Sequence, residues 1–220
     1  MQLTHLFQQA KQASRSVASM TDEARNAVLL AVAEEIRTQS ASLLQANRKD
    51  LAAMHKSNPL YDRLMLTDER LCAISPDMEN VTRLPSPLGR VSHERTLDNG
   101  LRLHRVSARF GVIGVVYEAR PNVTFDVFAL CFKSGNVCVL KGGRDAEASN
   151  QAAVDLIHGV LRRMGVDEQA VVLLPATHEA TAEMLNAVGY IDLCIPRGGR
   201  KLIDFVRDTA RIPVIETGAG

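Results

Sequence analysis

Residues 111–144 read GVIGVVYEARPNVTFDVFALCFKSGNVCVLKGGR. An apolar run from Val112 to Tyr117 leads into a helical pattern from Val123 to Lys133, and a second apolar run covers Val137 to Leu140. Short apolar runs of this length suit buried strands, and a helix between two such strands forms a parallel β-α-β unit. The stretch therefore predicts the beginning of a parallel sheet.

The same alternation continues toward the end of the sequence. Further strands are expected at Val171–Leu174, Ile191–Ile195 and Pro213–Glu216, and further helices at Ala146–Met164, Glu179–Val188 and Lys201–Thr209. Five strands with four helical crossovers predict an α/β fold with a doubly wound, mostly parallel, Rossmann-like sheet.

Two segments precede the sheet. Residues 1–83 show helical periodicity, with Thr21 placed as an N-cap and a second helix start at Thr67. Residues 90–109 contain Asn99-Gly100, which predicts a β-hairpin with a two-residue turn. Because an isolated hairpin is only marginally stable in water, it should pack on its own domain or on another subunit. We therefore expect a homo-oligomer.

Composition excludes several classes of partner. The chain has 220 residues, of which 46% are hydrophobic, and 26 Lys and Arg balance 25 Asp and Glu. A net charge of +1 provides no global field to hold nucleic acid or an acidic membrane. No secretory signal or run of eighteen apolar residues occurs, which predicts a soluble, cytoplasmic protein. The four cysteines form no CxxC pair and are expected to be reduced core thiols, and no metal site is expected.

The segments after the strands carry the candidate chemistry, because ligands of open α/β sheets lie outside the carboxyl ends of the strands. These segments are Glu118 to Asn122, Lys141 to Arg144 and Pro196 to Arg200. All three contain Arg or Lys, and two contain a glycine pair that lets backbone N–H groups approach a phosphate. The pattern predicts a polyanionic ligand, although each pair also fits a simple tight turn with a solvated charge. The GxGxxG motif of ordinary Rossmann domains is absent.

Four stretches carry a resemblance to a known family. Residues 111–124 (GVIGVVYEARPNVT), 133–137 (KSGNV), 195–199 (IPRGG) and 212–215 (IPVI) resemble gamma-glutamyl phosphate reductase, a family of the aldehyde dehydrogenase superfamily. The resemblance covers essentially the whole chain. It implies reduction of gamma-glutamyl phosphate by NADPH to glutamate-5-semialdehyde and phosphate, in proline biosynthesis.

The resemblance also implies how the chain is organised. Residues 1–220 match the NADP-binding domain, including the helices of residues 1–83 and an oligomerisation hairpin at about 90–109. In this family a Cys of a second, catalytic domain attacks the acyl phosphate, and its motif lies beyond the matched stretch. The catalytic domain is thus expected to be absent, and the chain alone to be inactive.

Cofactor contacts follow from the resemblance. Lys141 matches a lysine that reaches the adenosine ribose, and Gly142, Gly143 and Arg144 follow where NAD-preferring members often place a Glu. Arg144 would pair with the 2′-phosphate of NADP(H), although it also fits a surface charge at a helix start. The turn of Pro196, Arg197, Gly198 and Gly199 matches the loop that packs on the cofactor pyrophosphate.

Three other residues are candidates for the chemistry. Asn122 matches an amide that stabilises the oxyanion of the intermediate, and it also suits an N-cap for a helix beginning at Val123. Arg120 is a candidate contact for the substrate phosphate or carboxylate, or a simple rim charge. Glu216 stands where hydrolytic relatives carry a general base, which a phosphate reductase does not need.

Two competing hypotheses stay open. The first is a non-catalytic binding or assembly module that uses the same sheet and hairpin. The second, if the resemblance is set aside, is a phosphate-binding transferase without redox chemistry. Turnover distinguishes the enzyme from the assembly module, and a preference among nicotinamide cofactors distinguishes it from the transferase.

Overall fold

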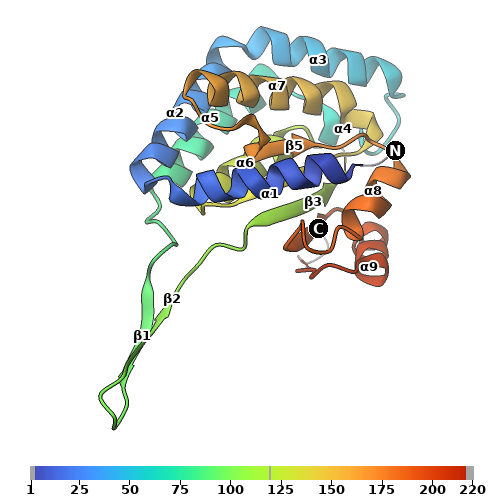
Figure 1. The fold of residues 1–220 in the computed structure, drawn as a ribbon. Coiled ribbons are helices and arrows are strands. Elements are labelled where there is room, and N and C mark those ends of the chain that lie inside the picture. The colour runs from blue at the N-terminus through green and yellow to red at the C-terminus, as the bar shows by residue number, and fades with distance from the viewer. Residues whose placement is uncertain (1–2, 119, 217–220) are drawn as a thin grey trace.

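A computed structural model describes residues 3–118 and 120–216 of the chain. Its main sheet has four parallel strands in the order β5-β4-β3-β6. The strands are β3 (Val112–Tyr117), β4 (Val137–Lys141), β5 (Val171–Leu173) and β6 (Leu193–Arg197). The predicted α/β fold with a doubly wound, parallel sheet is confirmed (Figure 1).

The fifth predicted strand, Pro213–Glu216, is wrong for the described residues. This segment makes one parallel bridge, between Cys194 and Val214, beside β6. The Cys194 amide donates to the Pro213 carbonyl at 2.8 Å, and the Ile215 amide donates to the Cys194 carbonyl at 3.0 Å. Pro213 has no N–H to extend the ladder toward its own N-terminal side. The segment therefore adds a single residue pair to this edge of the sheet.

Helices cover the sheet on both faces. The crossover helix α6 (Asn122–Lys133) packs on β3 and β4, and α7 (Glu147–Arg163) packs on β5. Helix α1 (Thr4–Ser19) packs on β3, β4 and β5. Figure 1 shows α1 crossing the front of the sheet, with α6 behind α1. The helices after the hairpin are α6 (Asn122–Lys133), α7 (Glu147–Arg163), α8 (His178–Leu185) and α9 (Arg200–Thr209), with short 3-10 helices η1 (Arg144–Ala146) and η2 (Glu168–Ala170).

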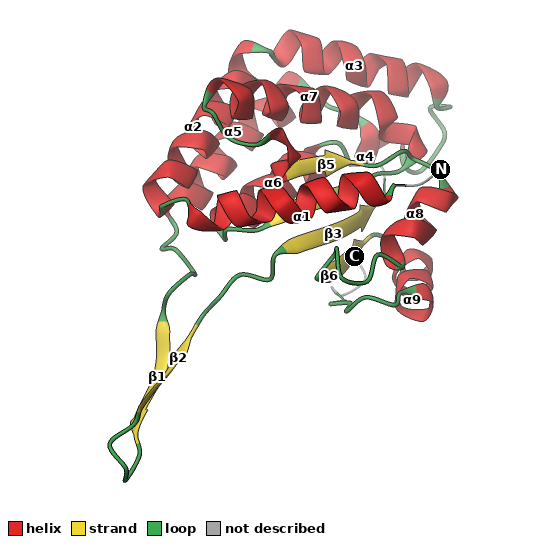
Figure 2. Cartoon of the chain, viewed as in Figure 1, coloured by secondary structure: helices red, strands yellow, loops and turns green. Residues whose placement is uncertain are grey.

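The N-terminal third is helical, as predicted. It contains α1 (Thr4–Ser19), α2 (Asp22–Thr38), α3 (Ser40–Ala53), α4 (Tyr61–Leu64) and α5 (Asp68–Arg83). The side chains of Thr21 and Thr67 accept hydrogen bonds from the amides of Ala24 and Arg70, which confirms both helix starts. Buried side chains of α1, α2, α3, α5 and the sheet form one contiguous core, whereas Leu64 of α4 packs with Ala146 in a small second cluster. Figure 2 shows the helices stacked around the strands.

Buried polar groups join the helices to the sheet layer. The Lys133 ammonium of α6 donates to Asp22 Oδ2 and Asn26 Oδ1 of α2, both at 2.8 Å, and to the Thr82 carbonyl of α5. Asp50 of α3 accepts hydrogen bonds from the first amides of α7 and so caps that helix. These bonds satisfy groups that would otherwise be buried without partners.

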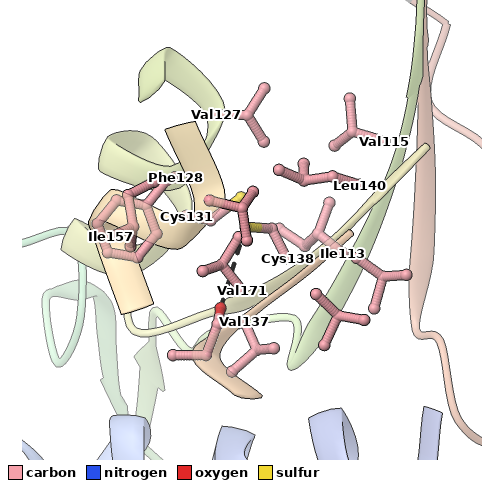
Figure 3. Packing of buried hydrophobic residues seen from close by; sticks show 14 of the residues in the cluster. Ile113, Val115, Val127, Phe128, Cys131, Val137, Cys138, Leu140, Ile157 and Val171 are labelled. Atoms are coloured by element: carbon pink, nitrogen blue, oxygen red, sulfur yellow. Dashed lines mark hydrogen bonds between the residues drawn. The ribbon is translucent and has the colours of Figure 1, made fainter. Parts of the chain in front are cut away.

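The cysteines are free thiols. Cys131 of α6 and Cys138 of β4 lie against each other in the apolar layer between helix and sheet, next to Val127 and Leu140 (Figure 3). Cys194 is also buried, as predicted, whereas Cys72 is exposed on α5. The prediction for Cys72 is wrong because its position lies on the solvent side of an amphipathic helix.

The predicted hairpin is present and projects away from the body of the molecule (Figure 2). β1 (Val91–Thr96) pairs antiparallel with β2 (Arg102–Val106), and every residue of both strands is exposed. The turn is longer than predicted, because the Leu97 amide donates to the Leu101 carbonyl and encloses three residues. Within this turn only Gly100 has a positive φ, +85°, which suits a type I turn followed by a glycine.

Within the described part of the chain, no helix is long and apolar enough to cross a lipid bilayer.

Candidate functional site

The topology places one crevice at the carboxyl end of the sheet. From β3 the chain proceeds to β4 and β5 on one side, and β6 joins β3 on the other, so the switch point lies between β3 and β6. A cavity of about 520 Å³ opens there. We call it the switch-point cavity; its rim carries Glu118, Arg120, Arg197, Gly198 and Gly199.

The glycine turn in this cavity holds an anionic group. Gly199 precedes α9, and its amide donates to Glu118 Oε2 at 3.1 Å. A Cβ added to Gly198 would lie 2.8 Å from Glu118 Cδ and 2.8 Å from Leu202 Cδ2. The start of a helix has a partial positive charge, and this turn leaves its amide open to a carboxylate or phosphate.

The inner wall of the switch-point cavity is apolar. Its side chains come from β3, α6 and β6 and include Val115, Val123, Val127, Leu130 and Ile195. A concave site with an apolar wall and a few convergent polar groups is typical of a small-molecule or cofactor site.

A second cavity, of about 380 Å³, adjoins the first and is polar. We call it the polar cavity; α4 and α5 form one wall, and the start of α6 with Arg120 forms the other. Its charged and amide side chains are Asp62, Arg63, Arg70, Asp77, Arg120, Asn122 and Asp126. Arg63 and Arg120 line both cavities and so mark the boundary between them.

Asn122 belongs to this polar cavity and is not an N-cap. It is the first residue of α6, after Pro121 in helical conformation (φ −59°, ψ −31°), and no side chain caps the helix. The Val123 amide instead donates to the Arg120 carbonyl. Asn122 Nδ2 donates to Asp126 Oδ2 at 3.3 Å. The N-cap alternative is therefore wrong, and the side-chain amide faces a cavity rather than its own helix end.

Asp126 is a perturbed acid in this cavity. Burial is the largest effect and raises the pKa of Asp126 above its ordinary value. The positive charge of Arg197 and the Asn122 hydrogen bond act in the opposite direction, whereas the carboxylate of Asp77 raises this pKa further. Perturbed acids in a cleft are candidates for function.

The segment after β4 lies outside these two cavities. Lys141 ends β4 and is half-buried, and its pKa is lowered first by burial and then by Arg144. Arg144 begins η1 and is exposed. Gly142 and Gly143 line a separate cavity of about 260 Å³ together with Pro175. The predicted cofactor residues therefore fall into two groups at the same edge of the sheet.

Two predicted site residues lie elsewhere. Pro196 is buried within β6, opposite Val116 of β3, and does not line the switch-point cavity. Glu216 is exposed, with Oε1 4.0 Å from Arg207 Nη1, and lines neither cavity. Among the described residues, no cluster of three or more His, Cys, Asp or Glu is arranged to hold a metal ion.

The sequence interpretation missed four residues of the site. Glu118 was quoted only as part of a strand end, although it forms the one side-chain contact to the Gly199 amide that the described residues show. Asp126 follows Asn122 by four residues and therefore shares its helix face, which is a readable signal. Arg63 and Asp77 carry no such signal, because only the folding of α4 and α5 onto α6 brings them to the site.

Sequence comparison identifies relatives of the whole chain. No protein-family model matches the chain. A protein named gamma-glutamyl phosphate reductase from Bacteroides thetaiotaomicron is 56% identical over 218 residues, which are 99% of this chain and 52% of that protein. One from Pelodictyon phaeoclathratiforme is 57% identical over 210 residues, 96% of this chain and 50% of that protein. The chain thus spans about half the length of the curated relatives it matches.

Solved structures agree with this resemblance. Gamma-glutamyl phosphate reductase from Thermotoga maritima superposes with a TM-score of 0.94 at 35% identity, over 100% of this chain and 54% of that one. The Saccharomyces cerevisiae protein of the same name gives 0.90 at 28% identity, over 100% and 57%. A probable aldehyde dehydrogenase from Listeria monocytogenes shares the fold alone, with a TM-score of 0.75 at 15% identity, over 97% and 45%. By sequence and by fold, the chain is therefore related over its whole length to the gamma-glutamyl phosphate reductases, as the sequence motifs indicated.

Proposed function

We propose that this chain is the NADPH-binding part of a gamma-glutamyl phosphate reductase, which reduces gamma-glutamyl phosphate to glutamate-5-semialdehyde and phosphate in proline biosynthesis. The observation that carries the proposal is the Gly199 amide at the switch point, which already binds a carboxylate. The relationship to proteins of that name over the whole chain supports the same activity. We propose residues 1–220 as one NADP-binding domain.

The residues present fit a dinucleotide. The turn of Arg197, Gly198 and Gly199 offers a backbone amide and a guanidinium to the pyrophosphate, and a Cβ at Gly198 would displace the side chains of Glu118 and Leu202. Bound NADPH supplies a hydride to the reaction. The apolar wall of the switch-point cavity excludes water on one side of the ligand.

The other group of residues gives the preference for NADP(H). Lys141 is half-buried, and burial lowers its pKa, so a ligand oxygen that accepts from its ammonium restores solvation lost on folding. Arg144 is exposed beside it, at the start of η1, where its guanidinium is free to pair with a 2′-phosphate. Gly142 and Gly143 lie between these charges and the cavity beside Pro175.

Two residues act on the substrate in this proposal. Arg120 stands at the boundary of the two cavities, where its charge attracts the acyl phosphate. Asn122 donates its side-chain amide to the oxygen that becomes negative when the acyl carbon is attacked. Glu216 remains a candidate by position alone, and the reduction needs no base to activate water.

The nucleophile is expected from outside these 220 residues. Burial raises the pKa of Cys194 to about 12. The adjacent Cys131 and burial raise the pKa of Cys138 well above its ordinary value. Because the thiolate is the nucleophile, these thiols are unreactive at neutral pH. Cys138 and Cys194 are therefore not candidate nucleophiles, and we propose that the chain alone binds cofactor without turnover.

A second candidate function is assembly, and the projecting hairpin favours it. Val91, Leu103 and Val106 are apolar side chains on β1 and β2, and each is about half exposed. An exposed pair of strands with apolar side chains is suited to pairing with another chain. We propose that this hairpin joins subunits of a homo-oligomer, either beside the reductase activity or in place of it.

Calorimetric titration of the 220-residue chain with NADPH and NADH tests the proposal. We expect NADPH to bind more tightly, and Arg144→Glu to weaken NADPH by tenfold or more while leaving NADH nearly unchanged. Arg162→Glu, an exposed charge of α7, is the matched control. Equal loss for both cofactors with Arg144→Glu would refute the 2′-phosphate contact. No binding of either cofactor would favour the assembly module.

A further inference from the structure

The polar cavity contains charges of both signs in the small space between α4, α5 and α6. A substrate with only an acyl phosphate would need only positive charge there. Arg70 is not available to a ligand, because its guanidinium donates to Asp62 and to the Met65 carbonyl. Among the described residues, neither Arg63 nor Asp77 makes a hydrogen bond or ion pair with another side chain.

We propose that the polar cavity binds the free amino-acid end of the substrate, with the α-ammonium held by Asp77 and Asp126 and the α-carboxylate held by Arg63. This inference rests on the proposed function, since it assigns a subsite to the glutamyl substrate. It makes these three residues determinants of specificity for α-amino acids over simple acyl groups.

The arrangement of the two carboxylates supports an ammonium group. Asp77 and Asp126 both line the polar cavity, and the carboxylate of Asp77 raises the pKa of Asp126 against the lowering effect of the Arg197 charge. Asp126 accepts one hydrogen bond, from Asn122, and is half-buried. A cation between the carboxylates relieves their repulsion and replaces the water that Asp126 loses on burial.

The position of the polar cavity also supports binding of the substrate's amino-acid end there. Asn122, the proposed oxyanion donor, lies on the wall of the polar cavity, and Arg120 lies at its boundary with the switch-point cavity. A glutamyl group has three carbons between its acyl carbon and its α-carboxylate. With the acyl carbon near Asn122, the amino-acid end therefore extends into the polar cavity toward α4 and α5, and the acyl phosphate remains near Arg120.

The test uses three ligands that differ by one charged group each. L-glutamate carries both groups of the amino-acid end, glutarate lacks the ammonium, and γ-aminobutyrate lacks the α-carboxylate. We expect calorimetry or NMR titration of the 220-residue chain to show L-glutamate binding about tenfold or more tightly than either analogue. Binding of all three with equal affinity, or no binding of L-glutamate, would overturn the inference.

Variants then assign each group to its partner. Asp77→Asn and Asp126→Asn should each weaken L-glutamate about tenfold and leave glutarate unchanged, because glutarate has no ammonium. Arg63→Gln should weaken L-glutamate and glutarate and leave γ-aminobutyrate unchanged. Asp77 and Arg63 are exposed, so these two variants are expected to fold, which thermal denaturation checks.

Two exposed residues of α7 provide matched controls. Asp155→Asn removes one negative charge, as Asp77→Asn does, and Arg162→Gln removes one positive charge, as Arg63→Gln does. Because α7 does not line the polar cavity, neither control should change any affinity. Loss of L-glutamate and glutarate binding to the same extent in Asp77→Asn would overturn the ammonium assignment. NADPH titration separates the two proposals: NADPH binding without discrimination among the three ligands sinks only the subsite, and the converse sinks only the cofactor assignment.

Discussion

A glycine at position 142, just after β4, has two explanations: tight packing against neighbouring side chains, or close approach of a ligand to the backbone. The variant Gly142→Ala distinguishes them. A Cβ at this position would lie 2.2 Å from Asn150 Nδ2 and 3.3 Å from Tyr117 Cζ. Asn150 cannot move freely, because its Oδ1 accepts from Thr124 Oγ1 at 3.0 Å, and that hydroxyl also bonds to the Tyr117 hydroxyl at 2.8 Å. All three side chains are buried. Gly142→Ala must therefore displace a buried hydrogen-bonded network.

The magnitude follows from overpacking. An extra methyl group in a close-packed region costs about 1–3 kcal/mol. For a chain of this size each kcal/mol lowers the melting temperature by about 2–4 °C, so Gly142→Ala should melt about 2–12 °C below the parent. Scanning calorimetry and urea denaturation measure the change. Gly159→Ala, in the middle of α7 with no atom within 4 Å of the added Cβ, should instead stabilise by about 0.5–1 kcal/mol.

A double-variant cycle isolates the contact. In the Asn150→Ala background the clashing amide is gone, and the cost of Gly142→Ala should fall to near zero. A Gly142→Ala variant as stable as the parent, or an equal cost in both backgrounds, would refute the packing argument. In that case the role of Gly142 is ligand binding, and Gly142→Ala would lower nucleotide affinity without lowering stability.

Two further predictions concern the acids of the site. Glu118→Gln removes the negative charge beside the Gly199 amide. NADPH affinity, measured by calorimetry, should rise about two- to fivefold, because a charge at a helix end contributes roughly 0.3–1 kcal/mol. Unchanged or weaker binding would show that this carboxylate does not oppose the ligand. Because burial raises the pKa of Asp126, the folded chain binds more protons than the unfolded chain between the ordinary and the raised pKa, and stability falls as pH rises through that window. The free energy of unfolding of Asp126→Asn relative to the parent, from urea titrations, should therefore increase from acidic to neutral pH, and a pH-independent difference would contradict the shift.

Local signals in the sequence predicted the elements that local physics determines. Alternating apolar runs and helical patterns located β3 to β6 and the helices after them, and Thr21 and Thr67 marked their helix starts through their own side chains. The predicted start of α6 and the predicted strand at residues 213–216 were wrong because the backbone of a proline determined the local structure. Pro121 adopts helical angles and so begins α6 before the expected cap, and Pro213 limits pairing with β6.

The site was predictable only in part, for the same reason. Strand ends meet at one edge of a parallel sheet by topology alone, so Arg120, Arg197 and the two glycine pairs were identified from sequence order. The acidic and basic side chains of α4 and α5 reach the polar cavity through tertiary packing, which no periodicity encodes. Motif resemblance did not supply them either, because the motifs cover the sheet and not the helical wall.

The Glu118 carboxylate occupies the glycine turn at the start of α9. Gly198 and Gly199 form a turn with an amide that needs an acceptor, and the carboxylate at the end of β3 provides one. A phosphate bound at the same amide must displace this carboxylate or share the turn with it, and two anions at one helix end repel each other. Glu118, Arg120 and Arg197 lie on the same rim of the switch-point cavity. In the proposed function, the charge of Glu118 therefore bears on the binding of both the nucleotide and the substrate phosphate.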